Sequence, residues 1–413
     1  MLTYSWRRAV AERYNYLNLQ VRLPFNERRN TIYAKVRDGG LVMKPLKVLM
    51  LNRSFSLTGG VARVLLTFAR HCDHQRLELH MGSFRPFAPD MAEALAQTGT
   101  EMHVLGDAGN LGPALALRKI IKEQKIDIVV ATTLKAYLVA KLASTSKCRV
   151  LYWIHAIALV SDKRWKVAVY RWTARRDTLI FISEQVKKLH GYAGHRGCEA
   201  VILNGVEDVL SSGPLYDNNQ REVLGIPRAA FVVGYTAKFI AWKQHRTLLA
   251  AFSQLAHDLP DLQLVLIGNG ELRESTEAQA RDIPGGERIH FLGLRPDARQ
   301  LLGIMDAYVQ PSNGEGISIA VIEAMLARRA IVVSDAGALP EMIDDGSTGL
   351  MCRVLDASDL AGKIMVLAQD PEMRRRLGER ARQVALERFG TEHFVKSLTA
   401  VLESEPVVFR AAK

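Results

Sequence analysis

The stretch from Gln310 to Asp335 (QPSNGEGISIAVIEAMLARRAIVVSD) contains two carboxylates placed to bind a ligand with hydroxyl and phosphate groups. The pattern predicts that a strand ends at Pro311, that a polar glycine-rich loop follows, and that a helix begins near Ile317. Glu315 then lies in the loop, and Glu323 lies about two turns into the helix. Free N–H groups at a helix start bind anions, while carboxylates accept hydrogen bonds from ribose or sugar hydroxyls.

A plainer interpretation makes Glu315 a favourable first-turn acid and Glu323 a solvated helix residue. The neighbours of Glu323, in AVIEAML, are apolar, and a buried carboxylate without a partner is costly. These surroundings favour a functional role for Glu323.

Lysines and glycines after other predicted strands fit the same ligand. Lys238 and Lys243 follow FVVGYT (231–236), and two cations there suit a pyrophosphate, although a single lysine is more often a surface residue. Gly59 and Gly60 stand between the first strand and a helix, where the backbone can approach a diphosphate or a sugar. An ordinary turn explains these two glycines equally well when they are considered alone.

Gly268 and Asn269, in IGNG, follow another predicted strand and could admit a flat ring against the backbone. The stretch GNGELR is not a dinucleotide-binding fingerprint, because Arg273 stands where the last glycine would be.

Short β-branched runs that alternate with helical patterns predict βαβ units and parallel sheets covered on both faces. In the first half the expected strands are 47–52, 77–84, 101–106, 126–132, 149–154 and 178–183. After a linker rich in turn-forming residues (208–225), strands are expected at 231–236, 262–268, 288–293, 306–311, 330–335 and 348–352. Two helical segments, 371–389 and 392–403, end the pattern.

This alternation of strands and helices predicts the α/β class, with two doubly wound Rossmann-like domains facing across a cleft. The expected segments are a basic N-terminal extension (1–45), a first domain (46–206), a second domain (207–390) and a C-terminal segment (391–413). An apolar stripe in the extension predicts either an arm that packs on its own domain or stays partly disordered, or an interfacial membrane helix.

The chain of 413 residues has a formal net charge of +12, and 48% of its residues are hydrophobic, which excludes a disordered, collagen-like or disulfide-scaffold protein. The net charge is +6 over residues 1–45, +11 over 46–200 and −5 over 201–413, so an anionic partner should meet the first half. Four scattered cysteines, no long apolar run and no signal-peptide pattern predict a cytosolic protein with reduced thiols.

Together these motifs resemble the retaining GT-B glycosyltransferases of the family-four group, from about Leu46 to the C-terminus. The resemblance rests on the order and spacing of TGG, His155 after RVLYWI, NGVE, the Lys238/Lys243 pair, IGNGEL, FLG, EGISIAVIEAM and SDAGALPEMIDDGSTGL. The group usually has arginine where Lys238 stands and glycine where Gln244 follows Lys243. Lysine is a point charge and lacks the bidentate fork of arginine.

The resemblance implies the roles of the donor-site residues. Glu323 would bind the ribose of a nucleotide donor, Glu315 would hold hydroxyls of the donor sugar, and Ile317 and Ser318 would offer backbone N–H groups to the phosphates.

The resemblance also implies roles for the cations, the glycine loop and the histidine. Lys238 and Lys243 would neutralise the departing diphosphate, Gly59 and Gly60 would lie under it, and His155 would reach the sugar from the first domain. The final helix would return to the first domain, as is usual in this fold.

The expected reaction is transfer of a sugar from a UDP-, GDP- or ADP-sugar to a lipid-linked or envelope saccharide. The resemblance implies retention, and the absence of a DxD motif favours cations and helix N–H groups over a metal cofactor. The alternatives are a nucleotide-sugar epimerase or hydrolase on the same fold, or a weakly active membrane-associated scaffold.

Two other groups of residues invite a functional reading. HCDH (71–74) and the set His190, His195 and Cys198 contain metal-capable types, but they are interpreted as residues at helix ends, so no metal site is expected. A basic–aromatic cluster from Lys163 to Arg176 predicts contact with a membrane or a lipid-linked acceptor, on the inner face of the cell membrane, ahead of nucleic acid.

Overall fold

The computed structural model describes residues 35–37, 40–42, 44–155, 164–191, 194–211 and 213–404. The chain forms two compact units, Met1–Leu203 with Val395–Lys413, and Asn204–Phe394. The sequence analysis expected the boundaries to follow residues 206 and 390. The predicted N-terminal arm or membrane helix lies outside the described residues.

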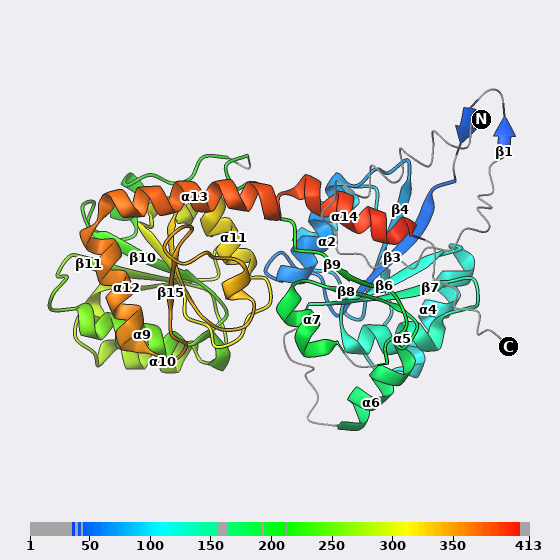
Figure 1. The fold of residues 1–413 in the computed structure, drawn as a ribbon, viewed down its shortest axis with the longest axis horizontal. Coiled ribbons are helices and arrows are strands. Elements are labelled where there is room, and N and C mark those ends of the chain that lie inside the picture. The colour runs from blue at the N-terminus through cyan, green and yellow to red at the C-terminus, as the bar shows by residue number, and fades with distance from the viewer. Residues whose placement is uncertain are drawn as a thin grey trace. The chain divides into compact units, whose positions relative to one another are not determined.

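The first unit contains a seven-stranded sheet with the order β5-β4-β3-β6-β7-β8-β9 (Figure 1). All neighbouring strands pair in parallel. The strands are β3 (Leu46–Asn52), β4 (Leu77–Ser83), β5 (Glu101–Val104), β6 (Ile128–Ala131), β7 (Arg149–Ile154), β8 (Thr178–Phe181) and β9 (Glu199–Val201). A separate antiparallel pair is formed by β1 (Lys35–Arg37) and β2 (Gly40–Val42).

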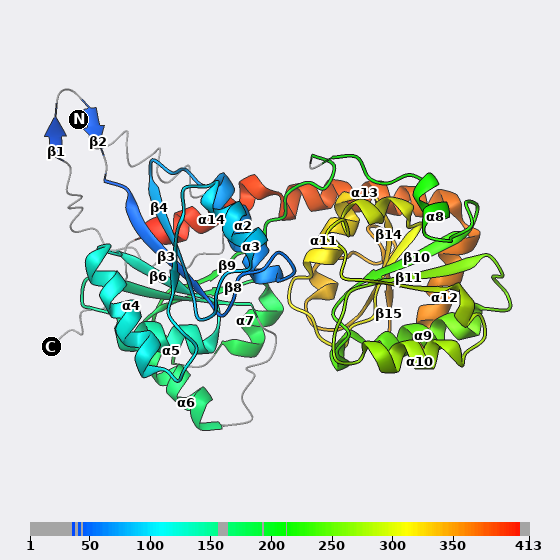
Figure 2. The same ribbon diagram turned by 180° about the vertical axis from the view of Figure 1, so that it is seen from behind.

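Helices cover both faces of this sheet. They are α2 (Gly60–His71), α3 (Pro89–Ala96), α4 (Leu111–Glu123), α5 (Leu134–Ala143), α6 (Arg164–Thr173) and α7 (Glu184–His190). The helices α2 and α3 lie on one face, and α4, α5 and α6 lie on the other (Figure 2). Because both faces are covered, a central strand such as β6 (IVVA) is buried at every residue.

The second unit contains a six-stranded parallel sheet with the order β12-β11-β10-β13-β14-β15. The strands are β10 (Phe231–Thr236), β11 (Leu262–Ile267), β12 (Ile289–Gly293), β13 (Ala307–Gln310), β14 (Ala330–Ser334) and β15 (Leu350–Cys352). The helices are α8 (Asn219–Val223), α9 (His245–Leu255), α10 (Arg273–Arg281), α11 (Ile319–Leu326), α12 (Ala357–Gln369) and α13 (Pro371–Phe389). Four 3-10 helices join them, η1 (Ala241–Lys243), η2 (Gly286–Arg288), η3 (Gln300–Ile304) and η4 (Leu339–Glu341).

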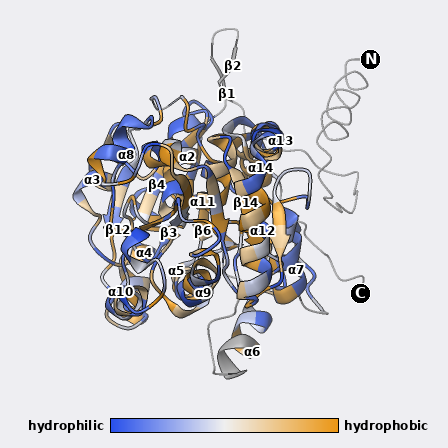
Figure 3. Cartoon of the chain, turned by 90° about the vertical axis from the view of Figure 1, so that its left-hand side faces the viewer, coloured by the Kyte–Doolittle hydropathy of each residue, from blue (hydrophilic) through white to orange (hydrophobic). Residues whose placement is uncertain are grey.

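The layers of the second unit follow the hydropathy of its sequence. α9, α10 and α12 cover one face of the sheet, and α11 and α13 cover the other (Figures 1 and 2). Figure 3 shows α10 and α13 as largely hydrophilic ribbons, whereas the strands between the helices are hydrophobic.

The last helix, α14 (Thr391–Glu403), returns to the first unit. The guanidinium of Arg149, at the start of β7, donates to the carbonyl oxygens of Leu402 at 3.1 Å and Ser404 at 2.7 Å. The predicted fold class is therefore confirmed, including the return of the final helix.

Every strand expected from the sequence is present, but the prediction missed the short strands β1, β2 and β9 and the helix α8. β9 has 3 residues and α8 has 5, too few for a periodic pattern, and α8 lies within the stretch interpreted as a linker. In the described parts of the chain, no helix combines the length and apolar character needed to cross a bilayer.

Candidate active site

The predicted donor residues of the second unit lie at the carboxyl edge of its sheet, where the strand order reverses. β10 is central, β11 and β12 follow on one side, and β13 begins the other side. Lys238 and Lys243 follow β10, while Glu315 follows β13. Neighbouring parallel strands that lead away in opposite directions leave a crevice at their carboxyl ends, which is the usual ligand site of such sheets.

Glu315 is fixed by three donors that converge on one carboxylate oxygen. Its Oε1 accepts hydrogen bonds from Gln310 Nε2 at 2.8 Å, from Ser312 Oγ at 2.9 Å and from the ammonium of Lys243. The carboxylate is mostly buried, with 13% of the side chain exposed. Oε2 has no donor among the described residues, so it can accept hydrogen bonds from hydroxyl groups of a ligand.

Two buried tyrosines support this network through hydrogen bonds of their hydroxyl groups. The hydroxyl of Tyr235 donates to the carbonyl oxygen of Lys243 at 2.8 Å, and the hydroxyl of Tyr308 lies 3.2 Å from Gln310 Oε1. Burial raises the pKa of both tyrosines above the usual value, so both remain neutral donors. The sequence analysis gave no role to Gln310 or Ser312, although polar residues that end an apolar strand could have pointed to them.

The loop after β10 separates the two lysines. Lys238 is exposed and forms no ion pair with a described residue, whereas Lys243 ends η1 and pairs with Glu315. Gln244 adopts the left-handed conformation, with φ 55° and ψ 40°. Glycine adopts this conformation most easily, which accounts for the glycine usual at this position in the group that the sequence resembles.

Glu323, on α11, is buried and paired. Only 6% of the residue is exposed, and its Oε1 accepts a hydrogen bond from Arg299 Nε at 2.6 Å. Arg299 also lies 3.9 Å from a carboxylate oxygen of Glu207, from the motif NGVE. Glu323 is therefore not a solvated helix residue, and Arg299 offsets the cost of burying its charge. Sequence reasoning missed Arg299, and the contact of Glu323 with a ribose stays a prediction.

The start of α11 carries the predicted backbone donors. Ser318 is the N-cap residue, and its N–H points at the sulfur of Met342 at 3.4 Å, a weak acceptor. Ile317 precedes it and is buried. Donation by Ile317 and Ser318 to phosphate oxygens stays a prediction.

Gly268 has a structural reason to be glycine. Its φ is 140°, and a Cβ atom there would lie 2.0 Å from the carbonyl oxygen of Ala237. The contact of a flat ring with the backbone of Gly268 and Asn269 stays a prediction. Asn269, next to it, is exposed and caps the N–H of Gly270 at 2.8 Å.

In the first unit, Gly59 is the N-cap residue of α2 and Gly60 is the first residue of that helix. The φ of Gly59 is −91°, and a Cβ atom there would have its nearest neighbour at 3.4 Å, an ordinary contact. Neither conformation nor packing requires glycine at position 59. The approach of a ligand to Gly59 and Gly60 stays a prediction.

His155 follows β7 and lies 4.5 Å from the ring of Trp153, measured between ring centroids. Its Nε2 is buried and has no hydrogen-bond partner among the described residues. Burial lowers the pKa of His155 to about 3, so the ring is neutral near pH 7. A neutral imidazole can exchange one hydrogen bond with a sugar hydroxyl.

The metal-capable histidines named from the sequence are engaged by their neighbours. His74 Nε2 lies 2.8 Å from the carbonyl oxygen of Ala69, and His195 Nδ1 lies 3.2 Å from the carboxylate of Glu199. Of the residues in these two groups, His71 ends α2 and His190 ends α7, whereas His74 and His195 lie in the loops that follow.

The prediction that the basic–aromatic cluster contacts a membrane is wrong for one of its residues, Tyr170. Tyr170 is fully buried and packs edge-on against Tyr152 at 5.5 Å, so it cannot contact a membrane. Trp172, by contrast, is 77% exposed. Lys163 lies outside the described residues.

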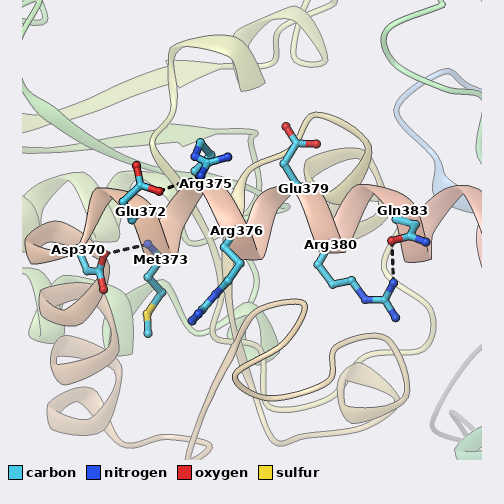
Figure 4. Close-up of a pocket in the computed structure, with 8 residues that line it drawn as sticks. All are labelled: Asp370, Glu372, Met373, Arg375, Arg376, Glu379, Arg380 and Gln383. Atoms are coloured by element: carbon cyan, nitrogen blue, oxygen red, sulfur yellow. Dashed lines mark hydrogen bonds and ion pairs between the residues drawn. The ribbon is translucent and has the colours of Figure 1, made fainter.

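Two hollows of the second unit lie away from the predicted donor residues. One, of about 660 Å³, runs along α13. Figure 4 shows Arg376 and Arg380 pointing to the opposite side of that helix from Glu372 and Glu379, so the charges do not converge on a ligand. The other, of about 460 Å³, includes Asp306 and lies at the amino ends of the strands.

Comparisons with known proteins agree with the fold. The family model described as Glycosyltransferase Family 4 matches residues 58–209, and the model described as Glycosyl transferases group 1 matches residues 217–384. The chain belongs to the glycosyltransferases, as a family-4-type member with the GT-B fold.

Among curated relatives, the putative glycosyltransferase EpsD of Bacillus subtilis is 28% identical over 71% of this chain and 81% of its own length. The lipopolysaccharide core biosynthesis glycosyltransferase LpsE of Rhizobium meliloti is 30% identical over 45% of this chain, and the match spans about half (54%) of LpsE. The solved structure of HepE from Anabaena in complex with UDP and glucose has a TM-score of 0.75 at 23% identity, covering 87% of this chain and 100% of HepE.

Proposed function

We propose that this glycosyltransferase moves a sugar from a nucleotide-diphosphate sugar to a saccharide carried on a lipid or an envelope polysaccharide. The observation that carries the proposal is the ion pair of Lys243 and Glu315 at the switch point of the second sheet. It joins a cation suited to a phosphate with a carboxylate whose Oε2 can hold sugar hydroxyls. The complex of HepE with UDP and glucose, and the part of LpsE in lipopolysaccharide core synthesis, support the donor and acceptor classes.

The proposed chemistry retains the anomeric configuration. The bond between the anomeric carbon and the diphosphate oxygen breaks, and the acceptor oxygen bonds to the carbon on the same face. The proton of the acceptor hydroxyl passes to the departing phosphate, so no protein nucleophile is needed. Lys238, Lys243 and the N–H groups at the start of α11 stabilise the negative charge of the leaving group.

We also propose that transfer needs no metal. Fixed cations and helix N–H groups supply the positive charge, and no DxD motif occurs in the 413 residues. Transfer should continue after exhaustive chelation, whereas a strict need for Mg²⁺ or Mn²⁺ would contradict this part of the proposal.

The donor site is tested by thermal unfolding with UDP, GDP, ADP and their common sugar conjugates. A ligand at 100 times its Kd stabilises the folded state by about 2.7 kcal/mol, which shifts the midpoint measurably. One nucleotide series should stabilise the wild type, and Glu323→Gln should lose that shift. Glu287→Gln is the matched control, because the Glu287 side chain is 76% exposed and has no proposed role.

The alternatives are separated by nucleotide release measured with and without saccharide acceptors. A transferase releases nucleotide only when an acceptor is present, a hydrolase or epimerase does not need the acceptor, and a scaffold releases none. Absence of any nucleotide-induced shift would contradict the donor site and favour the scaffold.

We propose in addition that the protein associates peripherally with the inner face of the cell membrane. Trp172, Arg175 and Arg176 are exposed at the end of α6 and just beyond it. An exposed indole next to cations suits the interface of an anionic leaflet, where each basic residue contributes about 1 kcal/mol.

A further inference from the structure

Three side chains of metal-ligand type meet at the edge of the first unit's sheet. His80 lies on β4, and Glu101 and His103 lie on the edge strand β5. His80 pairs in register with Glu101, and Gly82 pairs with His103, so all three side chains leave the same face. Neither the proposed transfer nor the proposed membrane contact uses them.

The distances between the possible ligand atoms suit a small tetrahedral ion. His80 Nδ1 lies 3.1 Å from His103 Nε2 and 3.4 Å from Glu101 Oε2, and the latter two atoms are 3.8 Å apart. With metal–ligand bonds of about 2.0–2.1 Å, the ligands of a tetrahedral Zn²⁺ stand about 3.3–3.4 Å from one another. Two imidazoles and a carboxylate form one of the ligand sets that leave a fourth position open.

A second layer of contacts sets the tautomer of His80. Its Nε2 lies 3.3 Å from a carboxylate oxygen of Glu78, which also accepts a hydrogen bond from the ammonium of Lys47. When Nε2–H donates to Glu78, Nδ1 presents its lone pair to His103 and Glu101. Histidine ligands of metals are commonly oriented by a carboxylate in this way.

The three side chains of the cluster range from fully buried to exposed. His80 is fully buried, the His103 side chain is 15% exposed, and the Glu101 side chain is 56% exposed. An ion can therefore enter from the solvent side of β5, and the fourth position faces water.

We propose that His80, Glu101 and His103 bind one Zn²⁺ with a water in the fourth position, and that Glu78 orients His80. The ion would tie the edge strand β5 to β4. The sequence analysis expected no metal, but the alternation Glu-x-His occurs in both predicted strands, as Glu78/His80 and as Glu101/His103. This proposal does not rest on the proposed transfer.

The test measures zinc binding to the tag-free, full-length chain after stripping with a chelator and desalting. Equilibrium dialysis should give one Zn²⁺ per wild-type chain, and Zn²⁺ should raise the thermal midpoint. Glu101→Gln and His103→Gln should each lose this ion and the shift. Glu78→Gln should bind about 10- to 100-fold more weakly. His257→Gln is the control, because the His257 side chain is fully exposed.

The alternative is a pair of histidines joined by a direct hydrogen bond. Absence of bound Zn²⁺ in the wild type would favour that alternative and overturn the proposal, and equal zinc binding by the wild type and Glu101→Gln would overturn the assignment of Glu101 as a ligand. Glu101 is exposed on an edge strand, so its substitution leaves the fold intact and the comparison stays valid. With Co²⁺ in place of Zn²⁺, the wild type should show the visible absorption of a tetrahedral ion, and its absence would count equally against the site.

Discussion

The side chains of the donor site derive their properties from their partners. Glu315 accepts three hydrogen bonds on one oxygen, and Glu323 is compensated by Arg299. A buried charge that loses its partner is costly, so each carboxylate is held in one place. Both carboxylates are therefore held in fixed positions, as the proposed binding of a ligand with several hydroxyl groups would require.

Replacing Glu315 with glutamine removes its charge and keeps its size. We expect kcat/KM to fall about 10- to 150-fold, because one charge-assisted hydrogen bond of about 1.5–3 kcal/mol is lost. The thermal midpoint should fall as well, because the mostly buried Lys243 loses the partner of its charge. Steady-state kinetics with saturating acceptor provide the measurement, with Glu287→Gln as the control. An unchanged kcat/KM would remove Glu315 from the site.

Alanine variants of Gly59 and Gly268 distinguish a role in ligand binding from a structural role. Gly268→Ala should destabilise the protein strongly, because the new Cβ atom would lie 2.0 Å from Ala237 O at a φ of 140°. Gly59→Ala should keep the stability within about 0.5 kcal/mol of the wild type and weaken nucleotide-sugar binding. Denaturant unfolding and ligand titration of both variants check this pair of outcomes. Normal ligand affinity in Gly59→Ala would contradict the role of Gly59.

At the scale of elements, the connection from η1 to α9 contains one residue with an unfavourable backbone conformation. Gln244 has a φ of 55°, which costs a residue with a side chain about 1–2 kcal/mol relative to the right-handed region. Gln244→Gly should match or slightly exceed the wild-type stability, whereas the β-branched Gln244→Val should lose about 1–2 kcal/mol. Urea unfolding checks the order of the three proteins, and a Val variant as stable as the Gly variant would contradict it.

The elements themselves were largely predictable, because parallel strands covered on both faces are almost continuous apolar runs. β6 and β11 are recognisable for this reason, whereas β9 and α8 are too short to show a period. The partners of the site residues were not predictable to the same degree. Arg299 reaches Glu323 from a segment 24 residues earlier, and only the fold brings the two together.

At the scale of the whole molecule, the basic excess of the first half predicts an electrostatic contact with membranes. Anionic vesicles should bind the protein at low salt and release it at high salt, because the attraction falls off within a Debye length. Trp172→Ala should weaken flotation with phosphatidylglycerol vesicles, while Trp242→Ala, at another exposed tryptophan, should not. Failure of the wild type to float at low salt would exclude the membrane contact.

The stability of the molecule should also depend on pH through its buried histidines. His245 stacks on Phe239 at 4.0 Å, and burial, followed by the charge of Lys243, lowers its pKa from 6.5 to about 4. Between these values the unfolded chain binds more protons than the folded one, so the free energy of unfolding falls as the pH is lowered from 6.5 to 4. His245 accounts for about 3 kcal/mol of that loss, and His155, whose Nε2 atom is buried, acts in the same direction.

His245→Gln removes the titrating group, so its stability should decline less steeply with acid than that of the wild type. The measurement is urea unfolding at several pH values between 4 and 7, comparing slopes rather than absolute stabilities, because the variant also loses the stacking on Phe239. His257→Gln is the control and should keep the wild-type slope, because the His257 side chain is fully exposed. Identical slopes for all three proteins would mean that His245 is protonated in the folded state, and the neutral, stacked ring beside Lys243 would have to be abandoned.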